Sequence, residues 1–338
     1  MVIPTLDARD LLAPTLESLA RQTVPARVVV VDNASRDGTA EMVADRFPGV
    51  MVLRNERNLG FGRAINRALP AVDGEFVVLV NNDVVCEAAF VEEICRPFDD
   101  PAIGMVAGVL TRSREPGVID SAGIELDRTL GAADRLEGRP VDAALAAPDP
   151  VGPCGGAAAY RTSALRAVGG FDESFFAYWE DVDLAIRLRL AGWGCALAPR
   201  ARAVHHHGAT LGAASPRQRE LHAFGRGYVL ARYRVTRRPL RRLQVAVLDW
   251  PALLVHLLVR REPAPLRARW RGGREGRARG FAPSAEHLAT VPFREALARQ
   301  ASFLGLRLRR RLPAHLYEGG PAAGAADGER TGAQSSSR

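Results

Sequence analysis

Three acidic residues stand where this sequence is best suited to do chemistry. Glu180, Asp181 and Asp183 begin a predicted helix, whose apolar residues recur at helical spacing as far as Gly192. The helix dipole favours carboxylates at this end. Two glycines and five aromatic residues come just before them, namely Gly169, Gly170, Phe171, Phe175, Phe176, Tyr178 and Trp179. An aromatic-walled approach to a carboxylate suits a site that positions a hydroxyl and takes its proton, although an acidic cap on a core helix explains the same residues.

Polar residues also follow two of the predicted strands. Asp32 ends the apolar run at 28–31, and Asn81, Asn82 and Asp83 end the run at 75–80. If both strands are parallel, their ends meet at one edge of the sheet, where open α/β sheets bind ligands. Asp83 offers the hard oxygen ligand that Mg²⁺ or Mn²⁺ takes together with a diphosphate. An Asx turn leaving a strand explains this group equally well.

Three consecutive histidines, His205, His206 and His207, follow a further predicted strand. Alternate side chains of a strand point to opposite faces, so the three cannot all face one metal ion. We expect one of them to be a ligand, and we expect His206 and His207 to be solvated loop residues.

These residues need a scaffold, and the sequence predicts one of alternating strands and helices. Continuous apolar strands are predicted at 2–6, 28–31, 50–53, 75–80 and 103–110, and amphipathic helices lie between the first four. This pattern predicts an α/β fold with a mostly parallel sheet covered by helices on both faces. Neither GxGxxG nor GxxxxGK[ST] occurs, so a Rossmann dinucleotide site and a P-loop have no support.

The distribution of charge divides the chain. All 46 basic residues are arginine, and residues 217–311 hold 23 of them against 6 acidic residues. We therefore predict a catalytic domain at 1–212, a basic helical region at 213–317 and a disordered tail at 318–338. Residues 127–150, rich in Ala, Pro and Asp, are predicted to be an insertion or loop.

The cysteines and the N-terminus bear on the compartment. The four cysteines are far apart and form no CxxC, which predicts reduced thiols in a cytosolic protein. We expect no signal peptide, because the chain enters its first apolar strand at Val2. That abrupt start leaves open whether the first strand is complete.

Taken together, these segments resemble the family 2 inverting glycosyltransferases, which have the GT-A fold. The resemblance rests on seven motifs in this order: VIPTLD at Val2, VVVVDNASRDGT at Val28, NLGFGRAIN at Asn58, LVNND at Leu79, GGAAAYR at Gly155, GGFDESFFAYWEDVDLAIRLRLAG at Gly169 and VHHHGAT at Val204. It covers residues 2–210, and the combination is specific although each motif alone is not. Within the family, the sequence is most similar to the rhamnosyltransferase and galactofuranosyltransferase branch of cell-envelope polysaccharide synthesis.

The resemblance implies a role for each matching residue. Asp181, the second residue of the family's ED pair, would be the catalytic base. Asp83 matches the last acid of the DxD motif and would bind the metal, and His205 matches the first histidine of V-x-H-x-x-G-x-[ST] and would contact the metal or the diphosphate. Asp32 would lie against the nucleotide base. The other residues implied to bind the nucleotide or its phosphates are Pro4, Thr5, Asn58, Arg63, Asn81 and Asn82.

The sequence departs from the family pattern at two places. Asp7 stands where the family usually has asparagine, and the DxD motif is reduced to Asn81-Asn82-Asp83, which leaves one carboxylate. We therefore expect the site to hold its metal loosely in the absence of the sugar nucleotide.

The chemistry implied by the resemblance is glycosyl transfer from a nucleoside-diphosphate sugar, dTDP-rhamnose or a UDP-sugar, to a hydroxyl of a glycan or lipid-linked acceptor. A divalent metal, Mg²⁺ or Mn²⁺, would neutralise the departing diphosphate, and Asp181 would take the proton of the acceptor hydroxyl. With one base and no second carboxylate acting as nucleophile, the outcome should be inversion.

Other functions remain open. The thinned DxD motif permits a catalytically inactive GT-A-fold interaction module. A sugar nucleotidyltransferase would need a glycine- and arginine-rich loop after the first strand, where this chain has Pro4-Thr5-Leu6-Asp7. A nucleic-acid-binding protein is disfavoured, because the C-terminal arginines lack interleaved stacking aromatics.

The basic region predicts contact with a membrane. Its apolar run at 243–259 is interrupted by Asp249, Pro251 and His256, so we expect no membrane-spanning segment. Arginines flank this run on both sides, which suits the headgroup layer of an anionic membrane. We therefore predict a cytoplasmic enzyme held peripherally at the inner face of the cell membrane through residues 237–280. A helical region packed on the catalytic domain, with solvated arginines, is the alternative.

Overall fold

The computed structural model describes residues 1–206 and 215–309, the last seven of these by their backbone alone. Residues Met1–Leu297 form one compact unit, and a second unit begins at Ala298. His207 and the tail at 318–338 lie outside the described residues, so the expectations for them stay predictions.

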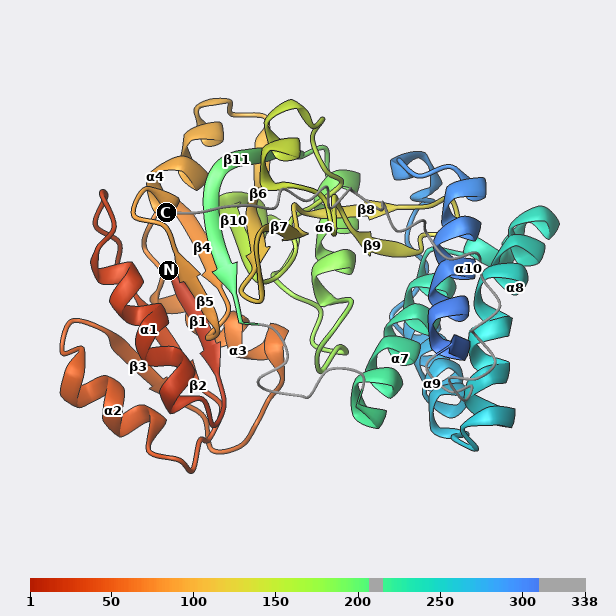
Figure 1. The fold of residues 1–338 in the computed structure, drawn as a ribbon, viewed down its shortest axis with the longest axis horizontal. Helices are drawn as coiled ribbons and strands as arrows, with labels where there is room; N and C mark the ends of the chain where they lie inside the picture. The colour runs from red at the N-terminus through yellow and green to blue at the C-terminus, as the bar shows by residue number, and fades with distance from the viewer. Residues whose placement is uncertain (207–214, 310–338) are drawn as a thin grey trace, which may run out of the picture. The chain divides into compact units, whose positions relative to one another are not determined.

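Within the first unit, nine strands form the main sheet, in the order β3-β2-β1-β4-β10-β6-β11-β5 with β7 beside β6 (Figure 1). The strands β1 to β4 are parallel to one another, β6 and β11 are also parallel, and β10 runs antiparallel between the two groups. Their bounds are β1 Val2–Thr5, β2 Val29–Asp32, β3 Met51–Arg54, β4 Phe76–Val80, β5 Val84–Cys86, β6 Ile103–Arg112, β7 Glu115–Ser121, β10 Ala157–Arg161 and β11 Gly194–His205. A separate pair is formed by β8 (Ile124–Leu126) and β9 (Ala132–Asp134).

Helices cover both faces of this sheet, as the continuous apolar strands predict. One face packs Ile3 and Val30 against α1 (Arg9–Ala20), α2 (Thr39–Arg46) and α4 (Phe90–Cys95). The next residues along the same strands, such as Val29 and Val31, point the other way, because side chains alternate along a strand. They pack against α3 (Phe61–Ala68), α5 (Thr162–Ala167) and α6 (Glu180–Leu190). The predicted α/β class, with a mostly parallel sheet and helices on both faces, is therefore confirmed.

The basic region is helical, as predicted. Its helices are α7 (Pro216–Arg232), α8 (Pro239–Leu254), α9 (Ala264–Ala278) and α10 (Phe293–Arg309). The first three belong to the same compact unit as the sheet, so the predicted boundary at 212 does not coincide with the division at Leu297. In Figure 1, α6 lies between the sheet and α7, and Ile186 of α6 shares an apolar cluster with Val229 and Leu230 of α7.

One feature of α8 bears on the expectation that no segment spans a membrane. The helix continues as a π-helical turn, Val255–Val259, and Pro239–Val259 is by length and composition long enough to cross a membrane, with 22% of its most apolar window buried. The sequence analysis treated Asp249 and Pro251 as interruptions, whereas the helix begins earlier and runs through both. Length and composition alone do not distinguish a membrane span from a helix at the surface.

The junction between α6 and α7 depends on Gly225. A side chain at this buried position would overlap the side chain of Trp179, which caps the start of α6. By contrast, a Cβ at Gly273 in α9 would meet its nearest neighbour at 3.6 Å, an ordinary contact.

We expect these two glycines to respond oppositely to substitution by alanine. Gly225→Ala should lower the free energy of unfolding by about 1–3 kcal/mol, because it overpacks the junction. Gly273→Ala should leave stability unchanged or raise it by up to about 1 kcal/mol, because alanine favours the helix. Urea denaturation followed by circular dichroism measures both, and equal stability of the two variants would contradict the packing described.

Candidate active site

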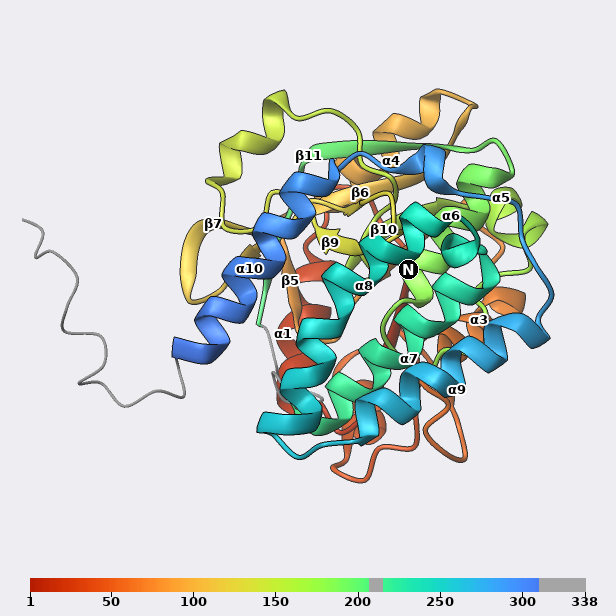
Figure 2. The same ribbon diagram turned by 90° about the vertical axis from the view of Figure 1, so that its right-hand side faces the viewer.

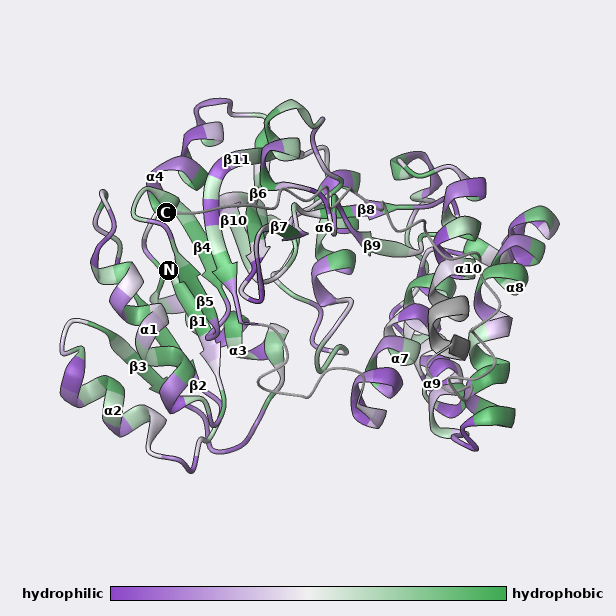
Figure 3. Ribbon diagram, in the orientation of Figure 1, coloured by the Kyte–Doolittle hydropathy of each residue, from purple (hydrophilic) through white to green (hydrophobic). Residues whose placement is uncertain are grey.

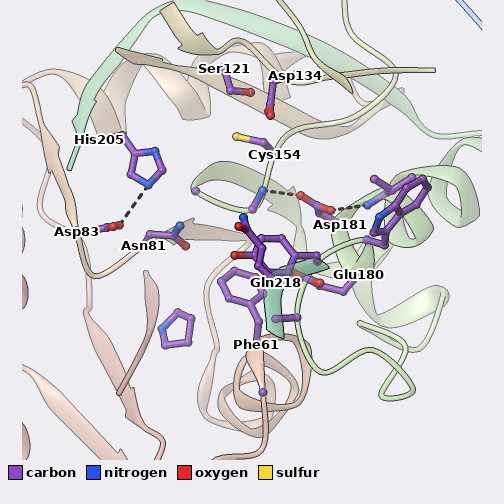
Figure 4. Close-up of a pocket in the computed structure, with 18 of the residues that line it drawn as sticks. Phe61, Asn81, Asp83, Ser121, Asp134, Cys154, Glu180, Asp181, His205 and Gln218 are labelled. Carbon is purple, nitrogen blue, oxygen red and sulfur yellow. Dashed lines mark hydrogen bonds and ion pairs between the residues drawn. The ribbon is translucent and has the colours of Figure 1, made fainter. Parts of the chain in front are cut away.

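A cavity of about 440 Å³ opens at the ends of β1 and β4 (Figure 4). Its wall takes residues from these strand ends, from the loop before α3, from β9, from the start of α6 and from α7. Eight of the predicted site residues line it: Pro4, Thr5, Asn58, Asn81, Asn82, Asp83, Asp181 and His205. The fold therefore brings together residues separated by up to 200 positions in the sequence.

The end of the cavity nearest the parallel strands is held by amide side chains. Asn82 Nδ2 donates to Thr5 Oγ1 at 3.1 Å, and Asn58 Oδ1 accepts from the backbone N–H of Gly60 at 2.9 Å. Asn33, which the sequence analysis did not single out, also lines the cavity and accepts a hydrogen bond from Asn55 at 2.8 Å. Its position directly after Asp32, at a strand end, is the sequence signal that could have identified Asn33 as a site residue.

Two predicted residues do not line the cavity. Asp32 is fully buried, its Oδ1 accepts from Ser35 N at 3.0 Å, and its Oδ2 accepts no hydrogen bond although it lies 3.4 Å from Arg54 Nε. Arg63 Nε donates to the backbone oxygen of Glu173 at 3.0 Å. Contact of either residue with a nucleotide therefore stays a prediction.

Asp83 and His205 converge at one corner of the cavity (Figure 4). His205 Nε2 lies 3.4 Å from Asp83 Oδ1, and His205 Nδ1 lies 2.7 Å from Asp120 Oδ2 on β7. Burial lowers the pKa of His205, but the carboxylates of Asp120 and Asp83 outweigh it and raise that pKa to about 9. The neighbouring His206 is exposed, as expected of a solvated residue.

The donor set at this corner fits a divalent cation in part. Asp83 supplies a carboxylate oxygen and His205 an imidazole nitrogen, which both occur as metal ligands. Asp120 stands where a carboxylate commonly orients a ligating histidine through its other nitrogen. Among the residues that the structure describes, no three His, Cys, Asp or Glu side chains are grouped to hold an ion by themselves. An ion at this corner would need further oxygen ligands, such as those of a diphosphate.

Asp181 stands on the opposite side of the cavity, in the first turn of α6. Its Oδ2 accepts from the backbone N–H of Gly155 at 3.1 Å, and its Oδ1 accepts from that of Val182 at 2.8 Å. The absence of a side chain at Gly155 leaves room for the Phe61 ring, because a Cβ there would lie 3.2 Å from that ring.

The three acidic residues of α6 differ in their surroundings. Asp183 is fully buried and paired with Arg187 Nε at 2.6 Å and with the Tyr233 hydroxyl at 2.8 Å. Glu180 is 5% exposed, and its Oε2 has no hydrogen-bond partner. Burial raises the pKa of Asp181, and burial together with the charge of Asp181 raises that of Glu180 well above its ordinary value. Asp183 is thus a structural acid, whereas Glu180 and Asp181 both line the cavity and both have a raised pKa; of these two, Asp181 is held by backbone N–H groups at both oxygens.

The backbone of the loop before α6 has a conformation that residues other than glycine rarely adopt. Tyr178 and Trp179 have φ of 65° and 74°, in the left-handed region. The Tyr178 ring stacks on His222 of α7, with centroids 4.3 Å apart, and Trp179 packs on Gly225 of the same helix. Because such backbone strain persists only where the surroundings hold it, α7 is the element that fixes the start of α6.

Several cavity residues were missed by the sequence analysis. Gln218 and His222 of α7 line the cavity, although they belong to the region taken as an appendage. Asp134 of β9 also lines it and lies within the stretch taken as an insertion. Asp134 is exposed, but the surrounding protein partly desolvates its carboxylate, and the charges of Asp181 and Asp120 repel it. These effects raise the pKa of Asp134 to about 6. No local pattern in the sequence marks these three residues.

Comparison with known proteins identifies relatives of this chain. The family model for glycosyl transferase family 2 matches residues 1–169, half of the chain. An N-acetylglucosaminyl-diphospho-decaprenol L-rhamnosyltransferase of Mycobacterium tuberculosis is 31% identical over 212 residues, which are 56% of this chain and 69% of that protein. An O-antigen biosynthesis protein of Myxococcus xanthus is 24% identical over 223 residues, 62% of this chain and 17% of that protein.

Solved structures agree on the fold. A mannosyltransferase from Pyrobaculum calidifontis, solved with GDP-Man and Mn²⁺, superposes with a TM-score of 0.52 at 20% identity, covering 94% of this chain and 87% of that one. At that identity the likeness supports the GT-A fold alone. With the family match and the relative at 31% identity, it follows that this chain belongs to glycosyl transferase family 2 and is a rhamnosyltransferase-like glycosyltransferase.

Proposed function

We propose that this enzyme transfers a sugar from a nucleoside-diphosphate sugar, dTDP-rhamnose or a UDP-sugar, to a hydroxyl of a glycan or lipid-linked acceptor in cell-envelope polysaccharide synthesis. One observation carries the proposal: the Asp83–His205 corner and the Asp181 carboxylate line the same cavity. The first suits a diphosphate and the second suits a hydroxyl. The names of the M. tuberculosis and M. xanthus relatives support the rhamnosyl donor and the envelope setting.

Asp181 would act as the general base. The N–H groups of Gly155 and Val182 hold both carboxylate oxygens, so the side chain has a defined orientation toward the cavity. Its raised pKa makes it a stronger base than an ordinary aspartate, which favours removal of a proton from a weakly acidic hydroxyl. Glu180 and Asp134 also line the cavity, and we assign neither of them a nucleophilic role, so that one base acts on the acceptor and the anomeric centre inverts.

Asp83 and His205 would hold Mg²⁺ or Mn²⁺ together with the donor diphosphate. When bound, the cation would supply Lewis-acid neutralisation of the leaving group. Because the pKa of His205 is raised to about 9, the proton on Nε2 would have to leave for a cation to bind there, while Asp120 would keep the other proton on Nδ1. Thr5, Asn33 and Asn58 would contact the nucleotide at the strand ends.

A lipid-linked acceptor would place this enzyme at a membrane. We propose a cytoplasmic protein bound peripherally at the inner face of the cell membrane, with residues 237–280 toward the lipid. The name of the rhamnosyltransferase relative, which gives it a decaprenol-linked substrate, supports an acceptor of this class.

The base assignment predicts a selective loss of activity. Asp181→Asn should lower the rate of transfer by about 10² to 10⁴, because the base is missing, while nucleotide binding stays close to normal. Product formation from a panel of UDP-, dTDP- and GDP-sugars measures the rate, and calorimetry measures donor binding. Asp73→Asn, at an exposed position, is the matched control. Near-normal transfer by Asp181→Asn would remove Asp181 from this role, and no turnover by the wild-type protein with any donor would favour an inactive interaction module.

The raised pKa predicts a pH-dependent stability difference. Because the folded-state pKa of Asp181 exceeds its unfolded value, the ionised carboxylate costs stability above the folded pKa, and this cost is absent below the unfolded pKa. Asp181→Asn should therefore be more stable than the wild type near about pH 7, and its advantage should fall as the pH drops toward about 4. Thermal denaturation across this range measures the difference. An advantage that does not change with pH would mean that the carboxyl titrates normally in the folded protein.

The metal assignment predicts a graded series. Asp83→Ala should weaken binding of both Mn²⁺ and the donor, His205→Ala should do so less severely, and His206→Ala should be close to silent, because its side chain is exposed. Calorimetric titration with Mn²⁺ and with nucleoside diphosphate gives the affinities separately from activity. Transfer that persists in EDTA would exclude the metal, and positive side chains would then have to stabilise the leaving group.

A further inference from the structure

The exposed apolar side chains of this protein concentrate on one helix. In residues 1–206 and 215–302, eight of the fourteen large hydrophobic side chains that are exposed lie between 240 and 259. They are Leu240, Leu243, Val247, Trp250, Leu254, Leu257, Leu258 and Val259. From Leu240 to Leu257 they recur every three or four residues, which puts them on one face of α8 and its π-helical extension. Leu240, Leu243 and Leu258 are more than 60% exposed.

Asp249 and His256, two of the residues that interrupt the apolar run in the sequence, lie on the opposite face. Asp249 pairs with Arg226 of α7 at 3.0 Å and also with Arg269 of α9. Arg241 pairs with Glu286 at 3.0 Å, and His256 is buried near Glu262. The outer face therefore carries no charged residue between Arg242 and Arg260, because Asp249, which lies between them in the sequence, is on the inner face.

Arginines border the N-terminal and C-terminal ends of this face. Arg237, Arg238 and Arg242 are exposed at the start of α8, and Arg261 is exposed just after its extension. An apolar stripe bordered by cations is the pattern of a helix that lies in the headgroup layer of an anionic bilayer. Figure 3 shows the hydrophobic colour along α8, and Figure 2 turns the α7, α8 and α9 side of the protein toward the viewer.

We propose that the outer face of α8, defined by Leu240, Leu243, Val247, Trp250, Leu254, Leu257 and Leu258, inserts into the headgroup layer of an anionic phospholipid membrane and lies parallel to its surface. The inference deepens the proposed function and rests on it, because an enzyme with a lipid-linked acceptor has to reach the membrane surface. It differs from the broad expectation for residues 237–280, because the insertion surface is a helix face and not the arginine-rich stretch of α9.

The inner face argues against a helix that crosses the bilayer. Spanning would carry Asp249 into hydrocarbon or separate it from Arg226 and Arg269, and an isolated charge there is strongly disfavoured. Lying in the interface keeps these ion pairs inside the protein and removes the apolar stripe from water. The charge of the border arginines also favours an anionic lipid surface over a second, equally basic copy of this face.

Sedimentation of the full-length protein with vesicles tests the inference without donor or acceptor, so its failure is distinguishable from failure of the proposed activity. The probes are vesicles of phosphatidylglycerol with phosphatidylcholine and vesicles of phosphatidylcholine alone. The wild type should sediment with the anionic vesicles, less so at high salt. Leu243→Glu with Leu258→Glu should weaken binding at least about tenfold, because two inserted side chains are lost. Arg237→Gln, Arg238→Gln and Arg242→Gln together should weaken binding and reduce its salt dependence.

The matched control is Leu145→Glu, because Leu145 is 53% exposed on a different surface. This variant should bind vesicles like the wild type. Tryptophan emission gives a second measurement: it should shift to the blue on vesicle addition, and the shift should largely disappear in Trp250→Phe. Equal recovery with and without anionic vesicles would overturn the proposal. Retention in the membrane after washing with alkaline carbonate would also overturn it, because that result indicates a spanning helix. A dimer that dissociates only in the Leu243→Glu, Leu258→Glu variant would overturn it too, because the face would then bind a second copy.

Discussion

The constraint on which this site depends is the burial of three carboxylates in the first turn of α6. Removing an ionised carboxylate from water costs several kcal/mol unless polar partners replace the water. Each of the three meets this cost differently. Asp183 has Arg187 and Tyr233, Asp181 has two backbone N–H groups, and one oxygen of Glu180 has no hydrogen-bond partner. Glu180 and Asp181, whose charges are compensated less than that of Asp183, both line the cavity, so the cavity receives two carboxyl groups of raised pKa.

The partners that make this arrangement possible come largely from the C-terminal helices. Tyr233, at the end of α7, bonds Asp183, and the Tyr228 hydroxyl of the same helix donates to Asp172 in the aromatic loop. The strained pair Tyr178 and Trp179 is packed against His222 and Gly225. The helical region is thus a part of the catalytic unit, since without α7 the start of α6 would lose both its polar partner and the surface that holds its backbone.

The same helices connect the cavity to the apolar face of α8. Arg226 of α7 pairs with Asp249 of α8 and donates to the backbone oxygen of Thr129 at 2.7 Å, close to the β8–β9 pair that carries Asp134. One buried guanidinium therefore joins the proposed membrane helix, the helix α7 that packs on the loop before α6, and a wall of the cavity. A shared polar network of this kind makes the three elements a single rigid support, because an unpaired member would be left buried and charged.

Several features were decided by the sequence alone. Continuous apolar strands with polar residues at their ends determined an α/β sheet, because strand ends are local features that neighbouring residues specify. The ten site residues were implied by the resemblance to family 2, and eight of them line one cavity. Tertiary structure alone decided the rest. It left Asp32 and Arg63 out of the cavity lining, brought in Asp120, Asp134, Gln218 and His222 from distant segments, and put Asp249 on the inner side of α8. Each of these outcomes depends on which elements pack together, and no local pattern in the chain records a partner more than a few residues away.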